Sequence, residues 1–169
     1  MEPELNKVEG LDGIEFYGAR LTTNQRKNMP ENGIQLSKVF NELGTDIIVY
    51  SCAETAFLKG VDGNKYISDQ ITKLTNQPAI SAMSSMIEAL KYLDIKNISL
   101  VTPYTEERTE VMLDFFERMG ITVSGSESKD FVQFSEDKRE WYECNVQPPY
   151  TAYQMAMKAN TNESEAIVI

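Results

Sequence analysis

Apolar and polar positions along the chain alternate between short apolar runs and longer stretches with helical spacing. Short runs rich in strand-forming residues predict strands at residues 13–21, 45–50, 78–81, 97–103, 121–127 and 164–169. Stretches whose apolar residues recur every three or four positions predict helices at residues 30–44, 63–77, 83–94, 105–120 and 148–160. Strands that alternate with helices are typical of a parallel sheet, so the expected fold class is α/β.

Two apolar runs, TDIIVY at residues 45–50 and SEAIVI at 164–169, resemble one another and form a weak internal repeat. Each has a polar residue, an acid and then continuous apolar residues, which is the pattern of a parallel strand buried on both faces. The repeat predicts two similar halves, 1–94 and 95–169, the first without its first strand. Because chain ends are normally exposed, the last run predicts that the chain is an internal fragment of a longer protein, with its second half truncated after Ile169.

Composition narrows the classes of partner. The chain has 169 residues, is 41% hydrophobic and has a formal net charge of −10, which argues against non-specific binding to nucleic acid. A small anionic substrate needs only a few local donors and stays possible. No apolar run approaches the ~20 residues of a membrane span, and the first ten residues lack the apolar segment of a signal peptide. Two distant cysteines make no disulfide framework, so we expect a cytoplasmic protein.

The chain contains no histidine. Ser-His and Cys-His catalysis are therefore excluded for its own residues, and the commonest transition-metal ligand is missing, so we expect no metal site. Cysteine, tyrosine, carboxylates, lysine and backbone amides remain for chemistry.

Cys52 and Tyr104 stand at the positions that best suit a site. Each directly follows a predicted strand, and ligands of open α/β sheets bind at the carboxyl ends of strands. A helix beginning after Cys52 would stabilise a thiolate and offer amides to an anion. On position alone the alternatives stay open: Cys52 as a small buried hydrophobe and Tyr104 as a packing residue. Cys144 lies in an irregular stretch, and the acid-rich TEERTE at 105–110 is typical of a solvated helix start.

Three stretches carry a family resemblance. NQPAISAMSSMIEALKYLDIKNISLVTPYTEE at residues 76–107 resembles the maleate cis-trans isomerase and arylmalonate decarboxylase branch of the Asp/Glu/hydantoin racemase superfamily. In that branch a Pro-Ala-Ile segment precedes a helix, a strand and a Val-x-Pro-Tyr loop. IIVYSCAETAFLKG at 47–60 is similar to the strand of that family that ends in Tyr-x-Cys, and MEPEL at 1–5 to the stretch after its first strand.

The resemblance implies two Rossmann-like halves with the active site in the cleft between them. It implies that Cys52 acts as nucleophile or acid/base partner and that Tyr104 hydrogen-bonds the substrate carboxylate. The turn formed by Ala53, Glu54 and Thr55 would bind a carboxylate through backbone amides. This turn departs from the frequent Thr-Ser-Gly-Ser, because Glu54 puts an acid beside an anion site.

The function implied is a cofactor-independent, cysteine-dependent isomerase that converts maleate or a related small dicarboxylate. A thiolate adds to the double bond, the resulting single bond rotates, and elimination gives the trans acid. A second cysteine is expected after Ile169. The family's substrate-contacting asparagine has no clear match in this chain: Trp141 falls near its place, and Asn145 is a weaker candidate. The alternatives are a Cys-pair amino-acid or hydantoin racemase, an arylmalonate decarboxylase-like enzyme, and an inactive fragment or binding module. The decarboxylases lack the first cysteine, so Cys52 argues against that member. We expect a homo-oligomer at full length, with neither nucleic acid nor membrane as partner.

Overall fold

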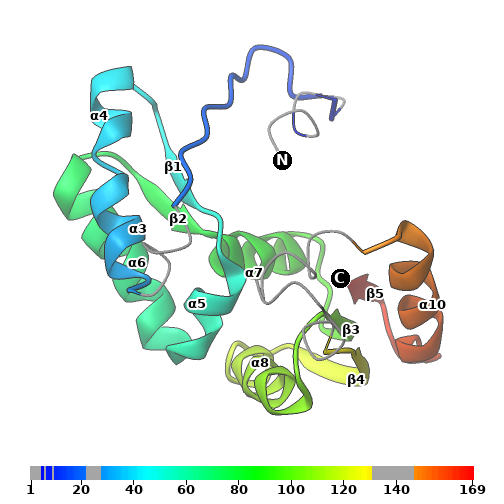
Figure 1. The fold of residues 1–169 in the computed structure, drawn as a ribbon. Helices are drawn as coiled ribbons and strands as arrows, with labels where there is room; N and C mark the ends of the chain where they lie inside the picture. Colours follow the sequence, from blue (N-terminus) through cyan, green and yellow to red (C-terminus); the bar gives the residue numbers. More distant parts are fainter. Residues whose placement is uncertain (1–4, 6, 9, 22–27, 131–146) are drawn as a thin grey trace.

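The structure is a computed structural model that describes residues 5, 7–8, 10–21, 28–130 and 147–169. Its strands are β1 (Ile48–Tyr50), β2 (Ala79–Ser81), β3 (Asn97–Thr102), β4 (Thr122–Ser128) and β5 (Ala166–Val168). The described residues form two parallel sheets, one with the order β1-β2 and one with the order β4-β3-β5 (Figure 1). The α/β class with parallel sheets is therefore confirmed.

All but one of the helices in the described part overlap the predicted helical stretches; the exception is Ala53–Leu58, where the sequence analysis predicted a turn after Cys52. The helices are α3 (Glu31–Leu36), α4 (Val39–Leu43), α5 (Ala53–Leu58), α6 (Gly60–Thr75), α7 (Ala82–Tyr92), α8 (Glu106–Arg118) and α10 (Pro149–Ala159). In α8 the Thr105 side chain accepts a hydrogen bond from the backbone N–H of Arg108 at 3.3 Å, as an N-cap residue does. Gly120 follows the helix with φ +80°, a left-handed conformation that favours glycine.

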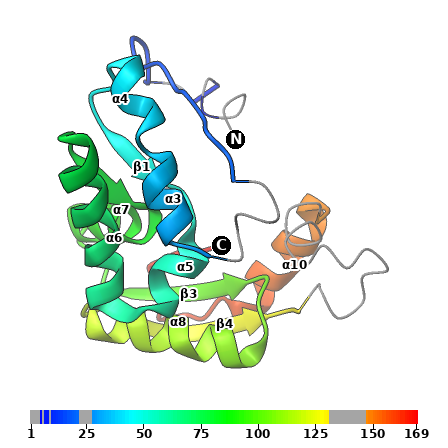
Figure 2. The ribbon, with the colours of Figure 1, turned by 60° about the vertical axis from the view of Figure 1, so that its left-hand side comes forward.

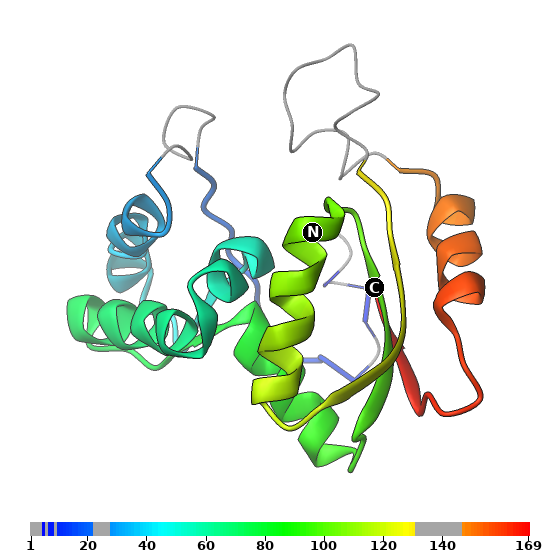
Figure 3. The ribbon, with the colours of Figure 1, turned by 90° about the horizontal axis from the view of Figure 1, so that it is seen from below.

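The β4-β3-β5 sheet lies between α8 on one face and α10 on the other (Figure 3). On the α8 side, Ile98 and Leu100 of β3 belong to the main core. On the α10 side, Val101 packs with Met155, Ala156 and Ala159 in a smaller cluster. The main core continues without a break to the β1-β2 sheet. Its buried residues are Ile34, Ile48, Tyr50, Ala56, Phe57, Ile67, Ile71, Met83, Ile87, Leu90, Ile98, Leu100, Met112, Phe115, Phe116, Ile121 and Val168.

A hydroxyl cluster joins the end of α10 and the segment before β5 to strands β3 and β4. Ser99 of β3 donates to the carbonyl oxygen of Ala159 at 2.8 Å, and Ser124 of β4 lies 2.9 Å from the hydroxyl of Ser164. Gly125 leaves the space for this approach, because a methyl group there would lie 2.1 Å from the same Ala159 oxygen. The smaller cluster is therefore held by polar contacts as well as by apolar ones.

The strand predicted at residues 13–21 is wrong. These residues form no strand, and the large side chains Ile14 and Tyr17 are exposed. Figure 2 shows the segment as a trace outside the layers. A strand needs a partner for its backbone hydrogen bonds, and within the described residues the segment pairs with neither sheet.

The single helix predicted at 30–44 is two helices, α3 and α4. Ser37 separates them: its hydroxyl donates to the carbonyl oxygen of Ile34 at 2.6 Å, and its backbone N–H is shared between the carbonyls of Gly33 and Ile34. Side-chain bonds of this kind compete with the helical ladder. The predicted end of the second helix is correct, since Gly44 takes a left-handed conformation with φ +65°.

The prediction that the strands at 45–50 and 164–169 are buried on both faces is also wrong. Ile48 and Tyr50 of β1 are buried while Val49 between them is exposed, and in β5 Val168 is buried while Ile167 is exposed. Within the described residues β1 pairs only with β2, and β5 only with β3, so both are edge strands. The division into halves 1–94 and 95–169 stays a prediction. No helix in the described ranges is long and apolar enough to cross a bilayer.

Candidate active site

Cys52 lies where the sequence predicted, just past the carboxyl end of β1. It is the N-cap residue of α5, with an extended backbone at φ −133° and ψ 95°. Its side chain is half-buried and packs against the main core. The first helical hydrogen bond runs from the N–H of Ala56 to the Cys52 carbonyl oxygen at 3.4 Å. The amides of Ala53, Glu54 and Thr55 precede that bond, at the start of the helix beside the thiol.

Tyr104 lies at the equivalent place after β3, immediately before α8. Its ring packs against Phe57 of α5, with the ring centroids 5.5 Å apart and the planes tilted by 57°. Phe57 is fully buried and lies on the helix that Cys52 begins. Five helical residues rise about 7.5 Å, so one short helix connects the thiol to the tyrosine. This arrangement favours a shared site, and the shared cleft itself stays a prediction.

Tyr50 is a site residue that the sequence analysis missed. The side chain is 7% exposed, and its hydroxyl lies 2.7 Å from the hydroxyl of Thr55. Thr55 also donates to the Cys52 carbonyl oxygen at 3.4 Å. Burial raises the pKa of Tyr50 to about 12, although the hydrogen bond between Tyr50 and Thr55 works in the opposite direction. The neutral phenol of Tyr50 therefore supports the turn after Cys52 through its hydrogen bond with Thr55. The signal in the sequence was a tyrosine within an otherwise aliphatic strand.

Glu54 forms an ion pair that joins α5 to α8. Its carboxylate Oε1 lies 2.8 Å from Nη1 of Arg108, and the side chains of Glu54 and Arg108 are 32% and 46% exposed. The two helices lie next to one another (Figure 2). The acid that the sequence placed beside an anion site is therefore paired with a cation. Arg108 was missed because the acid-rich start of α8 was interpreted as a solvated face.

The carboxyl end of β2 completes this edge of the β1-β2 sheet. Ser81 is fully buried and donates to the side-chain oxygen of Asn64 in a short hydrogen bond. Asn64 in turn donates to the hydroxyl of Ser84 at 2.7 Å. These contacts fix the turn between β2 and α7 against α6. The sequence analysis did not single them out, because Asn64 and Ser81 are joined only by the tertiary fold.

Three sequence candidates, Cys144, Trp141 and Asn145, lie outside the described residues. Within the described ranges, no three His, Cys, Asp or Glu side chains gather as a metal site requires.

Comparison with known proteins identifies the family. The family model "Arylmalonate decarboxylase" matches residues 19–137. The chain belongs to this family. It is also 21% identical over 164 residues to the maleate isomerase of Geobacillus stearothermophilus, covering 91% of this chain and 62% of that protein. The chain thus spans less than two thirds of the length of this maleate isomerase.

Solved structures show the same fold. A mutant of Nocardia farcinica maleate cis-trans isomerase with a covalently bound succinylcysteine intermediate superposes with a TM-score of 0.82 at 18% identity, covering 99% of this chain and 69% of that one. A mutant of the maleate isomerase Iso from Pseudomonas putida S16 with maleate gives 0.80 at 19% identity, covering 98% and 69%. A crystal structure of arylmalonate decarboxylase gives 0.66 at 15% identity, covering 81% and 56%. At these identities the likeness describes the fold.

Proposed function

We propose that Cys52 is the nucleophile of a cofactor-independent isomerase of the maleate cis-trans isomerase type. The observation that carries the proposal is its position: in a chain of this family, Cys52 follows β1, begins α5 and is half-buried against the core. Two further observations agree with it. One structural relative holds a succinylcysteine intermediate and another holds maleate.

The proposed reaction uses the chain's own groups. The Cys52 thiolate adds to one carbon of the double bond, and the electron pair moves onto the adjacent carboxylate as an enediolate. The hydroxyl of Tyr104 and the amides of Ala53, Glu54 and Thr55 donate hydrogen bonds to the carboxylates and stabilise the developing charge. Rotation about the new single bond follows. The enediolate then re-forms the double bond in the trans arrangement and expels the thiolate.

Conversion of maleate to fumarate, followed by proton NMR, tests the proposal. We expect turnover with the wild-type protein, a loss of at least about a thousandfold in Cys52→Ser, and no such loss in Cys144→Ser. Incubation with maleate should also add the mass of one maleic acid to the peptide that contains Cys52. Equal rates for wild type and Cys52→Ser, or an adduct confined to Cys144, would refute the assignment.

The family match supports a second candidate, a decarboxylation of the arylmalonate type. Carbon dioxide release from phenylmalonate, with no conversion of maleate, would favour it. Racemisation of an amino acid or a hydantoin would instead favour the Cys-pair racemase.

A further inference from the structure

The ion pair between Glu54 and Arg108 has a position that stability alone does not explain. Both side chains are substantially exposed, and exposed pairs of this kind contribute little to folding. Arg108 also lies in the first turn of α8, where the helix dipole disfavours a cation. The carboxylate of Glu54 pairs with Arg108, and Glu106 and Glu107 in the same first turn favour the dipole, which offsets part of that cost. The chain thus maintains a cation at a place where a helix does not favour one.

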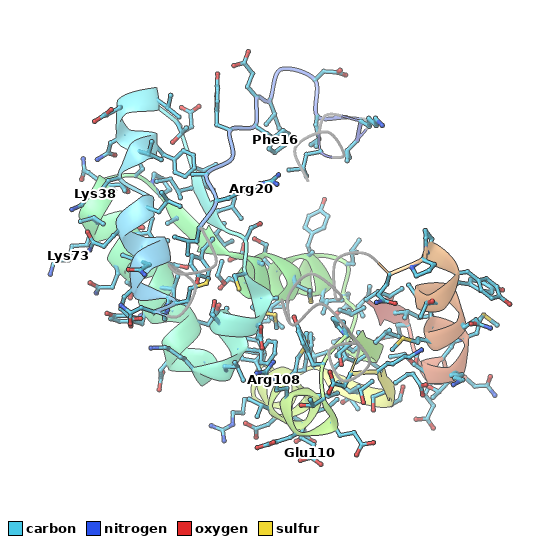
Figure 4. All side chains as sticks on the ribbon, in the orientation of Figure 1. Phe16, Arg20, Lys38, Lys73, Arg108 and Glu110 are labelled. Atoms are coloured by element: carbon cyan, nitrogen blue, oxygen red, sulfur yellow. The ribbon has the colours of Figure 1, made fainter. Side chains whose placement is uncertain are left out.

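The pair lies beside the candidate nucleophile. Glu54 is two residues after Cys52, a separation of at most ~7 Å along the chain, and Nη1 of Arg108 is 2.8 Å from the Glu54 carboxylate. On the other side, Arg108 is four residues after Tyr104 at the start of α8. Figure 4 shows Arg108 on the side of α8 that faces α5, whereas Glu110 lies on the opposite side of that helix.

The guanidinium can hold a second anion while it keeps Glu54. Arginine has five N–H donors in a planar arrangement that suits carboxylates, and the ion pair with Glu54 engages Nη1. Because 46% of the Arg108 side chain is exposed, part of that donor set is open to a ligand. The ion pair with Glu54 reduces the number of orientations open to the guanidinium, so less conformational freedom is lost when a ligand binds.

We propose that Arg108 is a specificity-determining residue of the Cys52 site: it binds one carboxylate of a dicarboxylate substrate, and Glu54 positions its guanidinium. This proposal rests on the proposed role of Cys52 as nucleophile. Without Arg108, Glu54 would repel an anion from the turn after Cys52. With it, a substrate that carries a carboxylate on each side of the reacting carbon atoms is preferred over a monocarboxylate.

Two thiol reagents of similar size test the proposal without any turnover. Iodoacetate carries a carboxylate and iodoacetamide is neutral, and both alkylate a thiolate by displacing iodide. The measured quantity is the rate constant for iodoacetate divided by that for iodoacetamide at Cys52. Peptide mapping determines it, so that modification of Cys144 is counted separately. One charge at this separation should change the ratio about threefold to tenfold. We expect Arg108→Gln to lower it, Glu54→Gln to raise it, and the double variant to fall between them.

Arg118→Gln is the matched control. Arg118 lies in the last turn of the same helix and forms an ion pair of the same length, 2.8 Å, with Asp114. It should leave the ratio unchanged. If Arg108 only tied α5 to α8, its loss would alter the rates with both reagents by the same factor, and an unchanged ratio in Arg108→Gln would overturn the proposal. Thermal melting of each variant shows whether the fold is retained. In the double variant amides replace both charged groups, so neither charge is left without its partner.

Protection of Cys52 by unreactive acids gives the second measurement. Succinate should slow alkylation by iodoacetamide more than butyrate does in the wild type, and this difference should disappear in Arg108→Gln. Equal protection by the two acids in the wild type would overturn the proposal and leave the role of Cys52 intact. A Cys52 that neither reagent modifies, while Cys144 reacts, would overturn both.

Discussion

Tyr50→Phe removes one buried oxygen beneath the Cys52 turn and leaves the ring in place. The hydroxyl of Tyr50 lies 2.7 Å from that of Thr55, so the substitution removes a buried hydrogen bond that contributes about 1 kcal/mol. The ring still fills the space beside Gly33, where a methyl group would lie 2.7 Å from the ring carbon Cε2. At neutral pH, therefore, the free energy of unfolding of the variant should be lower by about 1 kcal/mol.

Alkaline pH should remove this difference in stability. Burial raises the pKa of Tyr50 to about 12 from its ordinary value of 10.0. Because the folded pKa is the higher one, the stabilisation linked to the neutral phenol is fully present below pH 10 and is lost as the pH rises through 12. The shift of about two pKa units corresponds to ~2.7 kcal/mol, of which about half is lost by about pH 11. Phenylalanine cannot ionise, so the variant avoids this loss.

The assay is urea unfolding of both proteins between about pH 8 and about pH 11, followed by circular dichroism. Other groups titrate in both proteins and cancel in the difference between the two free energies. We expect the wild type to be more stable by about 1 kcal/mol at the lower pH, and the two proteins to be equally stable near pH 11. A constant difference across this range would refute the idea that Tyr50 is a buried, neutral phenol in the folded state.

Two further substitutions test contacts outside the site. Gly125→Ala places a methyl group 2.1 Å from the Ala159 carbonyl oxygen. It should therefore lower the free energy of unfolding by about 2–4 kcal/mol. A variant that unfolds at the same urea concentration as the wild type would contradict this packing. Glu165 accepts hydrogen bonds from the backbone N–H groups of Lys96 and Asn97 at 2.7 and 2.8 Å, which lower its pKa below the ordinary 4.5. The stabilisation by this carboxylate is present above pH 4.5 and lost as the pH falls through the lowered pKa. The melting temperature of Glu165→Gln should therefore fall less steeply with acid than that of the wild type. Equal slopes for the two proteins would contradict the contact.

The sequence predicted the elements that local chemistry decides. Thr105 begins α8 and Gly120 follows its end, as their side-chain chemistry requires, and the apolar run at 97–103 forms β3. The failures depend on partners far along the chain. Residues 13–21 have strand-forming composition, but their pairing depends on the rest of the sheet. The single hydroxyl of Ser37 divided a helix whose apolar spacing is continuous.

The site divides in the same way. The positions of Cys52 and Tyr104 at strand ends follow from the order of strands and helices, which the sequence shows. The contact of Tyr104 with Phe57, and that of Glu54 with Arg108, join residues far apart in the chain, and no local pattern predicts them. The sequence analysis predicted a solvated helix start at residues 105–110, which agrees with the exposure of Arg108, but it did not predict the ion pair with Glu54.

Two kinds of force therefore place the groups of the site. Apolar packing positions Tyr104, because its ring rests on Phe57, whose complete burial stabilises the fold by about 2–3 kcal/mol. Charge positions Arg108, because its guanidinium is held by Glu54, whose side chain is about one third exposed. Because both partners are partly exposed, added salt weakens the second contribution, whereas the apolar contact of Tyr104 with Phe57 involves no charge. The placement of Cys52 and Tyr104 thus depends on the core, whereas the proposed preference for an anion depends on one exposed pair. If the proposed role of Arg108 is correct, substitutions at Glu54 and Arg108 should change the preferred substrate class without altering the core that packs against Cys52.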